Sequence, residues 1–189
     1  EAWHNWGWQK QYQWSDSLQK KIWSGYQRLF EQAIPALIKV LDGRPYISSS
    51  PKYGWGRSAS LQEGDMHYWG VWWGLEPIKV YKIKIPRFMS EYGMQSMPGM
   101  ESLKLFSEKG DWDTSSYVIK VHQRHPTGFQ TLAHYLKDEH ITFTDFKTYV
   151  TATQELQSRA VQTAVEAHLN AQPYCMGSLV WQWNDCWPA

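Results

Sequence analysis

The first half of the chain contains apolar residues at spacings of three and four over residues 16–41, which predicts a helix with one apolar face. Ser15 lies just before this stretch and can cap the helix, and Asp42 and Gly43 end it. Pro35 interrupts the pattern, so we expect a kink or a second helix to begin there. A second long helix is predicted from its cap at Thr144 to about residue 172.

Short apolar runs between turn residues predict four strands, at residues 46–49, 65–69, 87–92 and 175–183. Strands that alternate with helices favour an α/β fold with parallel strands. Four strands do not close a barrel, so we expect about the last four strands of a (β/α)8 TIM barrel, with helices and long active-site loops. Residues 107–141 are predicted to be a mostly irregular insertion, with one short helix at 127–137.

Composition narrows the classes of function. The chain has 19 Lys and Arg against 18 Asp and Glu, a formal net charge of +1, which argues against nucleic acid or an anionic membrane as a partner. No apolar run is long enough for a membrane helix. The chain begins at Glu1 without an initiator Met, and we expect residues 1–189 to be a single piece of a larger multidomain protein.

The 13 Trp residues are unusual for 189 positions, and a packed core explains only part of them. Several lie beside polar residues in aperiodic segments, which is typical of the walls of a sugar-binding cleft: Trp6, Trp55, Trp72 and Trp73. We predict no cofactor, because no Gly-rich phosphate loop occurs. We predict no metal, because His122 and His125 lack a patterned third ligand. Cys175 and Cys186 are expected to be free thiols, with a disulfide as the alternative.

Glu91 comes at the end of a predicted buried strand. Burial of an unpaired carboxylate is costly, so such a residue is usually either functional or paired, here with Arg87 or a Lys. Gly93 is expected to let the chain turn sharply after it. The residues alone leave catalysis and a structural ion pair open.

The run Phe88-Met-Ser-Glu-Tyr-Gly-Met-Gln-Ser-Met-Pro98 resembles the nucleophile strand of β-mannosidases in glycoside hydrolase family 2. Three further segments agree in the same order, at residues 41–47, 65–69 and 180–187. The resemblance implies that Glu91 is the catalytic nucleophile of a retaining glycosidase, which releases terminal non-reducing β-D-mannose by double displacement.

The resemblance also implies that the acid/base Glu lies just before residue 1, so the chain alone is expected to be inactive. Glu1 lacks the preceding Asn and is expected to be a helper or bystander, with the acid itself as the alternative. Trp181 is expected to form the floor under the sugar or to be a core residue. His67 is expected to contact a hydroxyl or the surroundings of the nucleophile, or else to be structural, and Trp6 and Trp55 are expected to line the cleft. The implied partners are a β-mannoside or manno-oligosaccharide, the missing barrel half and accessory β-domains.

Several alternatives remain open. A β-galactosidase or β-glucuronidase of the same family would share the nucleophile strand. A carbohydrate-binding module would explain the aromatic residues without catalysis, but it predicts a β-sandwich. A barrel that has lost its activity is a third alternative, against which Glu91 argues. A bacterial periplasmic or secreted location is expected, with a lysosomal one as the alternative.

Overall fold

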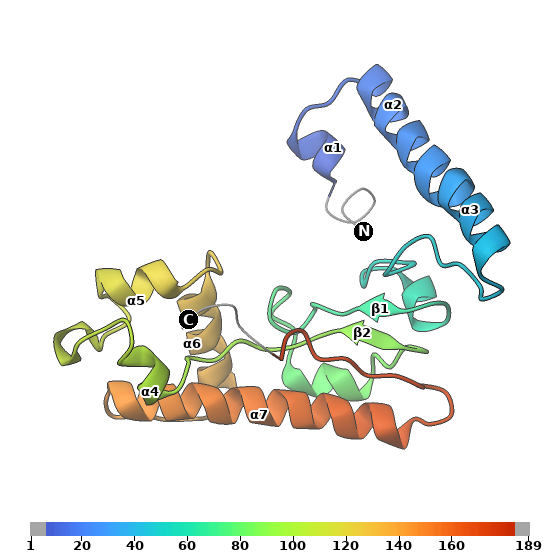
Figure 1. Cartoon of the computed structure of the whole chain (residues 1–189). Coiled ribbons are helices and arrows are strands. Elements are labelled where there is room, and N and C mark those ends of the chain that lie inside the picture. Colours follow the sequence, from blue (N-terminus) through green and yellow to red (C-terminus); the bar gives the residue numbers. More distant parts are fainter. Residues whose placement is uncertain (1–6, 184–189) are drawn as a thin grey trace.

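The computed structural model describes residues 7–183, which form an N-terminal arm (residues 7–41) and a body (residues 42–183). Figure 1 shows the arm standing away from the body. The arm contains α1 (Trp8–Gln11), α2 (Asp16–Tyr26), the π-helical segment η1 (Gln27–Ala33) and α3 (Ile34–Leu41), and none of these elements has a buried residue.

The helix predicted over residues 16–41 is confirmed. The Ser15 hydroxyl accepts a hydrogen bond from the amide of Leu18 at 3.3 Å, which caps α2. Pro35 lies in the first turn of α3, where its missing N–H is tolerated, and the π-helical segment comes directly before it. The arm therefore continues through Pro35 as a change of helix type. The short α1 was not predicted.

The strands of the body are parallel, as predicted. β1 (Met66–His67) pairs with β2 (Met89–Glu91), with Met66 opposite Met89 and His67 opposite Glu91. A parallel bridge joins Met89 to Ser178 on the other side of β2. The Met89 amide donates to the Gly177 carbonyl at 2.9 Å, and the Leu179 amide donates to the Met89 carbonyl at 2.8 Å. The backbone around residue 178 therefore runs parallel to β2, as a third extended segment beside the two strands.

The prediction of a strand at 46–49 is wrong, because this segment pairs with no strand in residues 7–183. A strand needs a hydrogen-bonded neighbour, and the pairing of β1 within this range is with β2 alone. The strand predicted at 175–183 is reduced to the single bridge at Ser178.

The other elements of the body, within residues 42–183, are helices. They are η2 (Ser58–Leu61), η3 (Ile78–Lys82), α4 (Met100–Leu103), η4 (Lys109–Asp111), α5 (Tyr117–His122), α6 (Gly128–Asp138) and α7 (Phe146–Asn170). α7 packs against η3 and α6 and runs beneath the strands in Figure 1. The short helix predicted at 127–137 is confirmed by α6, but the prediction that the rest of 107–141 is irregular is wrong, because it also contains η4 and α5.

The cap of α7 also differs from the prediction. Asp145, not Thr144, is the N-cap: its Oδ1 accepts from the Thr148 amide at 2.8 Å, and the Thr148 hydroxyl accepts from the Asp145 amide at 2.9 Å. The Thr148 amide and hydroxyl both donate to the Asp145 carboxylate and lower its pKa, because they favour its charged form.

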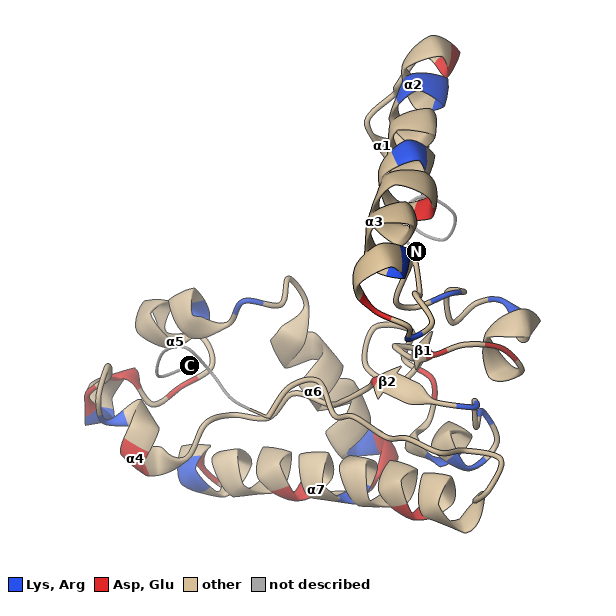
Figure 2. Cartoon of the chain, turned by 45° about the vertical axis from the view of Figure 1, so that its right-hand side comes forward, with Lys and Arg blue, Asp and Glu red and all other residues tan. Residues whose placement is uncertain are grey.

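The core of the body lies between the strands and α7. Tyr68, Tyr81 and Tyr92 are fully buried and pack edge to face in a row, with ring centroids 5.7 and 5.6 Å apart. Charges of both signs are spread over the arm and the body (Figure 2). No helix within residues 7–183 is long and apolar enough to span a membrane.

Candidate active site

Glu91 is the last residue of β2, so its side chain is presented at the carboxyl end of the parallel strands. Its Oε2 accepts a hydrogen bond from the Trp69 ring nitrogen at 3.2 Å and lies 3.4 Å from His67 Nδ1. The side chain is 22% exposed, so the carboxylate is accessible and also held by neighbours. This combination suits a nucleophile that must keep one orientation.

Behind His67 lies a second carboxylate, that of Asp65. The hydroxyls of Ser50 and Ser90 each donate to Asp65 Oδ2 at 2.5 Å. Burial raises the pKa of Asp65. The hydrogen bonds from Ser50 and Ser90, together with a backbone hydrogen bond and the nearby His67, outweigh burial and hold the pKa below its usual range. Asp65 therefore stays ionised at neutral pH.

The imidazole of His67 lies between the two carboxylates. Its Nε2 is 3.9 Å from Asp65 Oδ2 and 3.4 Å from the Ser50 hydroxyl, while Nδ1 faces Glu91. An anion on one side of an imidazole fixes its orientation toward the group on the other side. The arrangement therefore places an oriented ring against the Glu91 carboxylate.

A series of hydrogen-bonded polar side chains supports Tyr92, the residue that follows β2. The Tyr92 hydroxyl lies 2.9 Å from the Ser178 hydroxyl, which lies 2.8 Å from Nδ1 of His168 on α7. His168 is 2% exposed, and burial lowers its pKa to about 4, so it is neutral at pH 7. The chain ties α7 to the end of β2 directly beside Glu91.

Gly93 allows its own backbone to approach the backbone of Trp181 closely, next to the site. Residues 92–99 form no turn or bend, so the expectation that the chain turns sharply at Gly93 is wrong. A Cβ there would lie 2.3 Å from the Trp181 carbonyl oxygen, so no side chain fits. The Trp181 amide also donates to the Tyr92 carbonyl at 2.8 Å, which holds Trp181 beside the end of β2.

A cleft of about 930 Å³ opens next to these residues. Trp69 and Trp181 both line it, and the Trp181 side chain is 54% exposed. Because Trp69 also donates to Glu91, the cleft and the carboxylate site share a wall.

Of the predicted site residues, Glu91 and His67 are brought into contact, and Trp181 lines the adjoining cleft. Trp55 packs edge-on against Tyr68, with ring centroids 6.1 Å apart, and is not part of the cleft wall. Its contact with substrate stays a prediction. Trp6 and Glu1 lie outside the described residues.

Sequence reasoning missed Trp69 and Asp65 as site residues. The available signal was spacing, because alternate residues of a strand point to the same face and these two flank His67 at two positions on either side. Arg87, the suggested ion-pair partner of Glu91, stacks its guanidinium over the Tyr174 ring at 4.9 Å.

Within residues 7–183 no group of three or more His, Cys, Asp or Glu is arranged to hold a metal ion. His122 stacks on the Phe106 ring at 3.6 Å, and His125 Nδ1 accepts from the Thr127 amide at 3.2 Å. Cys175 is a buried free thiol, and Cys186 lies outside the described residues.

Comparisons with known proteins agree on one class, although no model of a protein family matches the chain. β-Mannosidase B of Aspergillus flavus is 31% identical over 166 residues, and that of Aspergillus niger is 29% identical over 166 residues. Each alignment covers 85% of this chain and 20% of the relative. The crystal structure of a β-D-mannosidase from Dictyoglomus thermophilum matches with a TM-score of 0.78 and 34% identity, over 86% of this chain and 20% of that one.

In sequence and in fold the chain is thus similar to part of a larger domain of glycosidases. More particularly, it is homologous to a segment of β-mannosidases. The chain spans about one fifth of the length of these relatives.

Proposed function

We propose that the chain is the nucleophile-bearing half of a β-mannosidase catalytic barrel of glycoside hydrolase family 2. The observation that supports this most directly is the Glu91 carboxylate at the carboxyl end of β2, within 3.2 Å of the Trp69 ring nitrogen and 3.4 Å of His67. In TIM barrels the catalytic groups lie at this end of the strands. The resemblance to β-mannosidases supplies the sugar class.

In the proposed reaction Glu91 attacks the anomeric carbon of a terminal β-mannosyl unit. The bond to the leaving oxygen breaks and a glycosyl ester of Glu91 forms, while a second carboxyl group protonates the departing oxygen. Water then attacks the same carbon and is deprotonated by that second carboxylate, which releases mannose with retained configuration. Trp69 and His67 hold the Glu91 carboxylate in the attacking orientation.

Asp65 is a poor candidate for the second carboxyl group. A general acid must be protonated before it acts, and the hydroxyls of Ser50 and Ser90 favour the ionised form of Asp65. On the resemblance to β-mannosidases, we assign the acid/base role to a Glu that precedes residue 1 in the complete polypeptide. The chain alone is then inactive toward ordinary glycosides.

The remaining part of the barrel and accessory β-domains are the proposed partners. The arm has large exposed apolar side chains, with Leu37, Val40 and Leu41 each more than 60% exposed. A parallel sheet is normally covered on its faces and extended at its edges, whereas β1 pairs only with β2 in the described part. The arm and the open side of β1 are therefore the surfaces that the other half covers.

Kinetics of the complete polypeptide test this function. Glu91→Gln is expected to lower kcat on an aryl β-mannoside by at least about a thousandfold, because an amide cannot form the glycosyl ester. Glu63→Gln, on an exposed residue paired with Lys52, is the matched control and keeps activity. NMR of the sugar first released is expected to show the β-anomer.

A substrate panel separates the rival sugars. Faster hydrolysis of a β-galactoside or β-glucuronide than of a β-mannoside would move the assignment to the sister activity. Full activity of Glu91→Gln would remove Glu91 from the reaction.

A further inference from the structure

Asp65 is a carboxylate close to the nucleophile for which the proposed reaction has no role. Its side chain is 18% exposed, and within residues 7–183 the only basic side chain within ion-pair distance of it is His67. A mostly buried carboxylate is costly to keep ionised unless its neighbours stabilise the charge. The contacts of Asp65 therefore indicate what its charge does.

The Asp65 side chain joins the loop around residue 50 to β1 and β2. The hydroxyls of Ser50, in that loop, and of Ser90, in β2, both donate to Oδ2 at 2.5 Å. The backbone amide of Lys52 donates to Oδ1 at 3.3 Å. Both carboxylate oxygens are therefore held in place immediately before β1, the strand that contains His67.

The Ser50 hydroxyl bridges Asp65 and His67. Asp65 Oδ2 and His67 Nε2 are 3.9 Å apart, which is too far for a direct hydrogen bond. Ser50 Oγ lies 2.5 Å from the first atom and 3.4 Å from the second. The other ring nitrogen, Nδ1, faces Glu91 Oε2 at 3.4 Å. A ring with contacts at both nitrogens cannot rotate without losing them, so the serine and aspartate fix how it meets the nucleophile.

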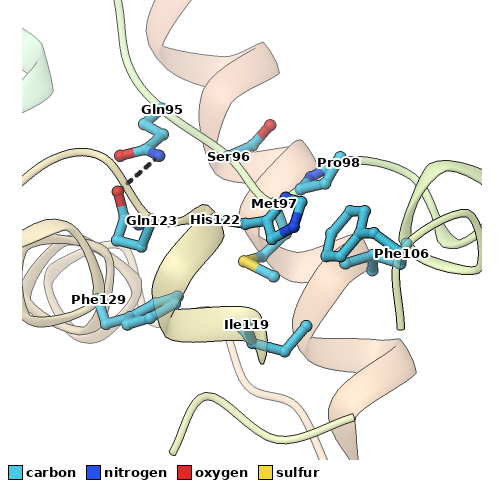
Figure 3. A pocket seen from close by; sticks show the side chains of 10 residues that line it. Gln95, Ser96, Met97, Pro98, Phe106, Ile119, His122, Gln123 and Phe129 are labelled. Atoms are coloured by element: carbon cyan, nitrogen blue, oxygen red, sulfur yellow. Dashed lines mark hydrogen bonds between the residues drawn. The ribbon is translucent and has the colours of Figure 1, made fainter. Parts of the chain in front are cut away.

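The chain segment that follows the nucleophile is held without Asp65. Gln95 donates to the Gln123 amide oxygen at 2.9 Å, as Figure 3 shows. The Gln157 side chain of α7 donates to the Met94 carbonyl at 2.6 Å. Removal of the Asp65 charge is therefore expected to leave this segment in place, so that the effect falls on the imidazole.

We propose that Asp65 and Ser50 are positioning residues of the catalytic site. They hold the imidazole of His67, which in turn holds the Glu91 carboxylate in its attacking orientation. The inference rests on the proposed function and adds two residues to it. A misoriented nucleophile lowers the rate of reaction more than the affinity for substrate, because the orientation matters most in the transition state.

A double-mutant cycle in the complete polypeptide tests this route from Asp65 through His67. Asp65→Asn keeps the shape of the side chain and is expected to lower kcat on an aryl β-mannoside about tenfold, with KM changed by less than about twofold. His67→Phe, which removes the ring nitrogens, is expected to lower kcat at least as much. In the His67→Phe background, Asp65→Asn is expected to lower kcat by less than about twofold further, because the residue through which it acts is gone.

Two further variants complete the experiment. Asp113→Asn is the matched control and keeps full activity, because this exposed carboxylate also accepts hydrogen bonds from a serine, Ser115, but lies outside the site. Ser50→Ala repeats the comparison with a smaller change and carries it if Asp65→Asn does not fold. It is expected to lower kcat about threefold in the wild-type background and to have no effect in the His67→Phe background.

An equal loss of kcat from Asp65→Asn in both backgrounds would make Asp65 a structural residue and overturn the inference. Unchanged kcat of Asp65→Asn in the wild-type background would overturn it as well. Both results leave the proposed function standing. A wild-type protein that does not hydrolyse the β-mannoside would overturn the proposed function and this inference together.

Discussion

Glu91 is positioned by residues that are distant in sequence but adjacent in the fold. Trp69 and His67 come from the neighbouring strand region, and the chain from Tyr92 through Ser178 to His168 supports the strand from the other side. The resemblance of motifs predicted Glu91 as the nucleophile. Which side chains contact Glu91 depends on the register of β1 against β2. Register follows from long-range pairing, so spacing alone could not show which side chains meet.

The hydrogen bond from Trp69 to Glu91 predicts that catalysis falls when the ring N–H is removed, even if an aromatic ring remains at position 69. Trp69→Phe in the complete polypeptide is expected to lower kcat/KM for an aryl β-mannoside about 10- to 100-fold, because hydrogen bonds to charged groups contribute about 1.5–3 kcal/mol. Trp112→Phe is the matched control, since its ring nitrogen is buried and has no hydrogen-bond partner among residues 7–183. Unchanged kinetics of Trp69→Phe would show that the contact with Glu91 is incidental.

The buried His168 predicts a dependence of local stability on pH. Its folded pKa of about 4 lies below the usual 6.5, so the folded state binds this proton less readily than the unfolded state. The contribution of neutral His168 to the stability of the folded state is full above pH 6.5 and is lost as the pH falls from 6.5 toward 4. Between pH 7.5 and 5 the loss is about 2 kcal/mol.

Hydrogen exchange of peptides from the C-terminal part of α7 measures this loss, after correction for intrinsic rates. Relative to the wild type, His168→Gln is expected to lose less protection between pH 7.5 and 5. An identical pH response in both proteins would contradict the neutral, buried state of His168.

At the scale of elements, the helices of 16–41 and 144–172 were predicted well because apolar periodicity and caps are local signals. The strand predicted at 46–49 is absent and α5 was not predicted, because strand pairing and burial are decided by residues distant in sequence. Tyr135 on α6 is an example: it is fully buried, and its hydroxyl donates to the Glu76 carbonyl at 2.8 Å and accepts from the Trp72 amide.

This contact predicts that α6 stabilises the loop that carries Trp69 and Trp73. Tyr135→Phe is expected to destabilise the loop by about 1–3 kcal/mol, because the Trp72 amide is left buried without a partner. Faster hydrogen exchange of a 69–76 peptide in Tyr135→Phe would report this destabilisation of the loop. Tyr149→Phe, a buried tyrosine of α7, is the comparison and should leave that peptide unchanged. Equal exchange in both variants would exclude an anchoring role for Tyr135.

At the scale of the whole molecule, the arm contains no buried residue, whereas the body has a continuous core. The apolar pattern predicted the arm's helix but not its separation from the body, because periodicity does not say what covers a face. Leu37 and Leu41 lie four residues apart and so share one side of α3.

Cysteine labelling tests whether the rest of a β-mannosidase covers this side. A Leu37→Cys variant is expected to react at least about tenfold more slowly with a thiol reagent in the complete polypeptide than in chain 1–189, because burial blocks access. Lys39→Cys, on the polar side of α3, should react at similar rates in both. Equal labelling of Leu37→Cys in both would contradict the proposed packing of the arm.

The most direct test of the central claim is covalent trapping of the nucleophile. The complete polypeptide is treated with 2-deoxy-2-fluoro-β-mannosyl fluoride, whose leaving group needs no acid, and the adduct is located by peptide mass mapping. The account predicts a fluoromannosyl ester on Glu91 that is absent in Glu91→Gln. A polypeptide that hydrolyses β-mannosides yet is labelled at a different carboxylate would contradict it.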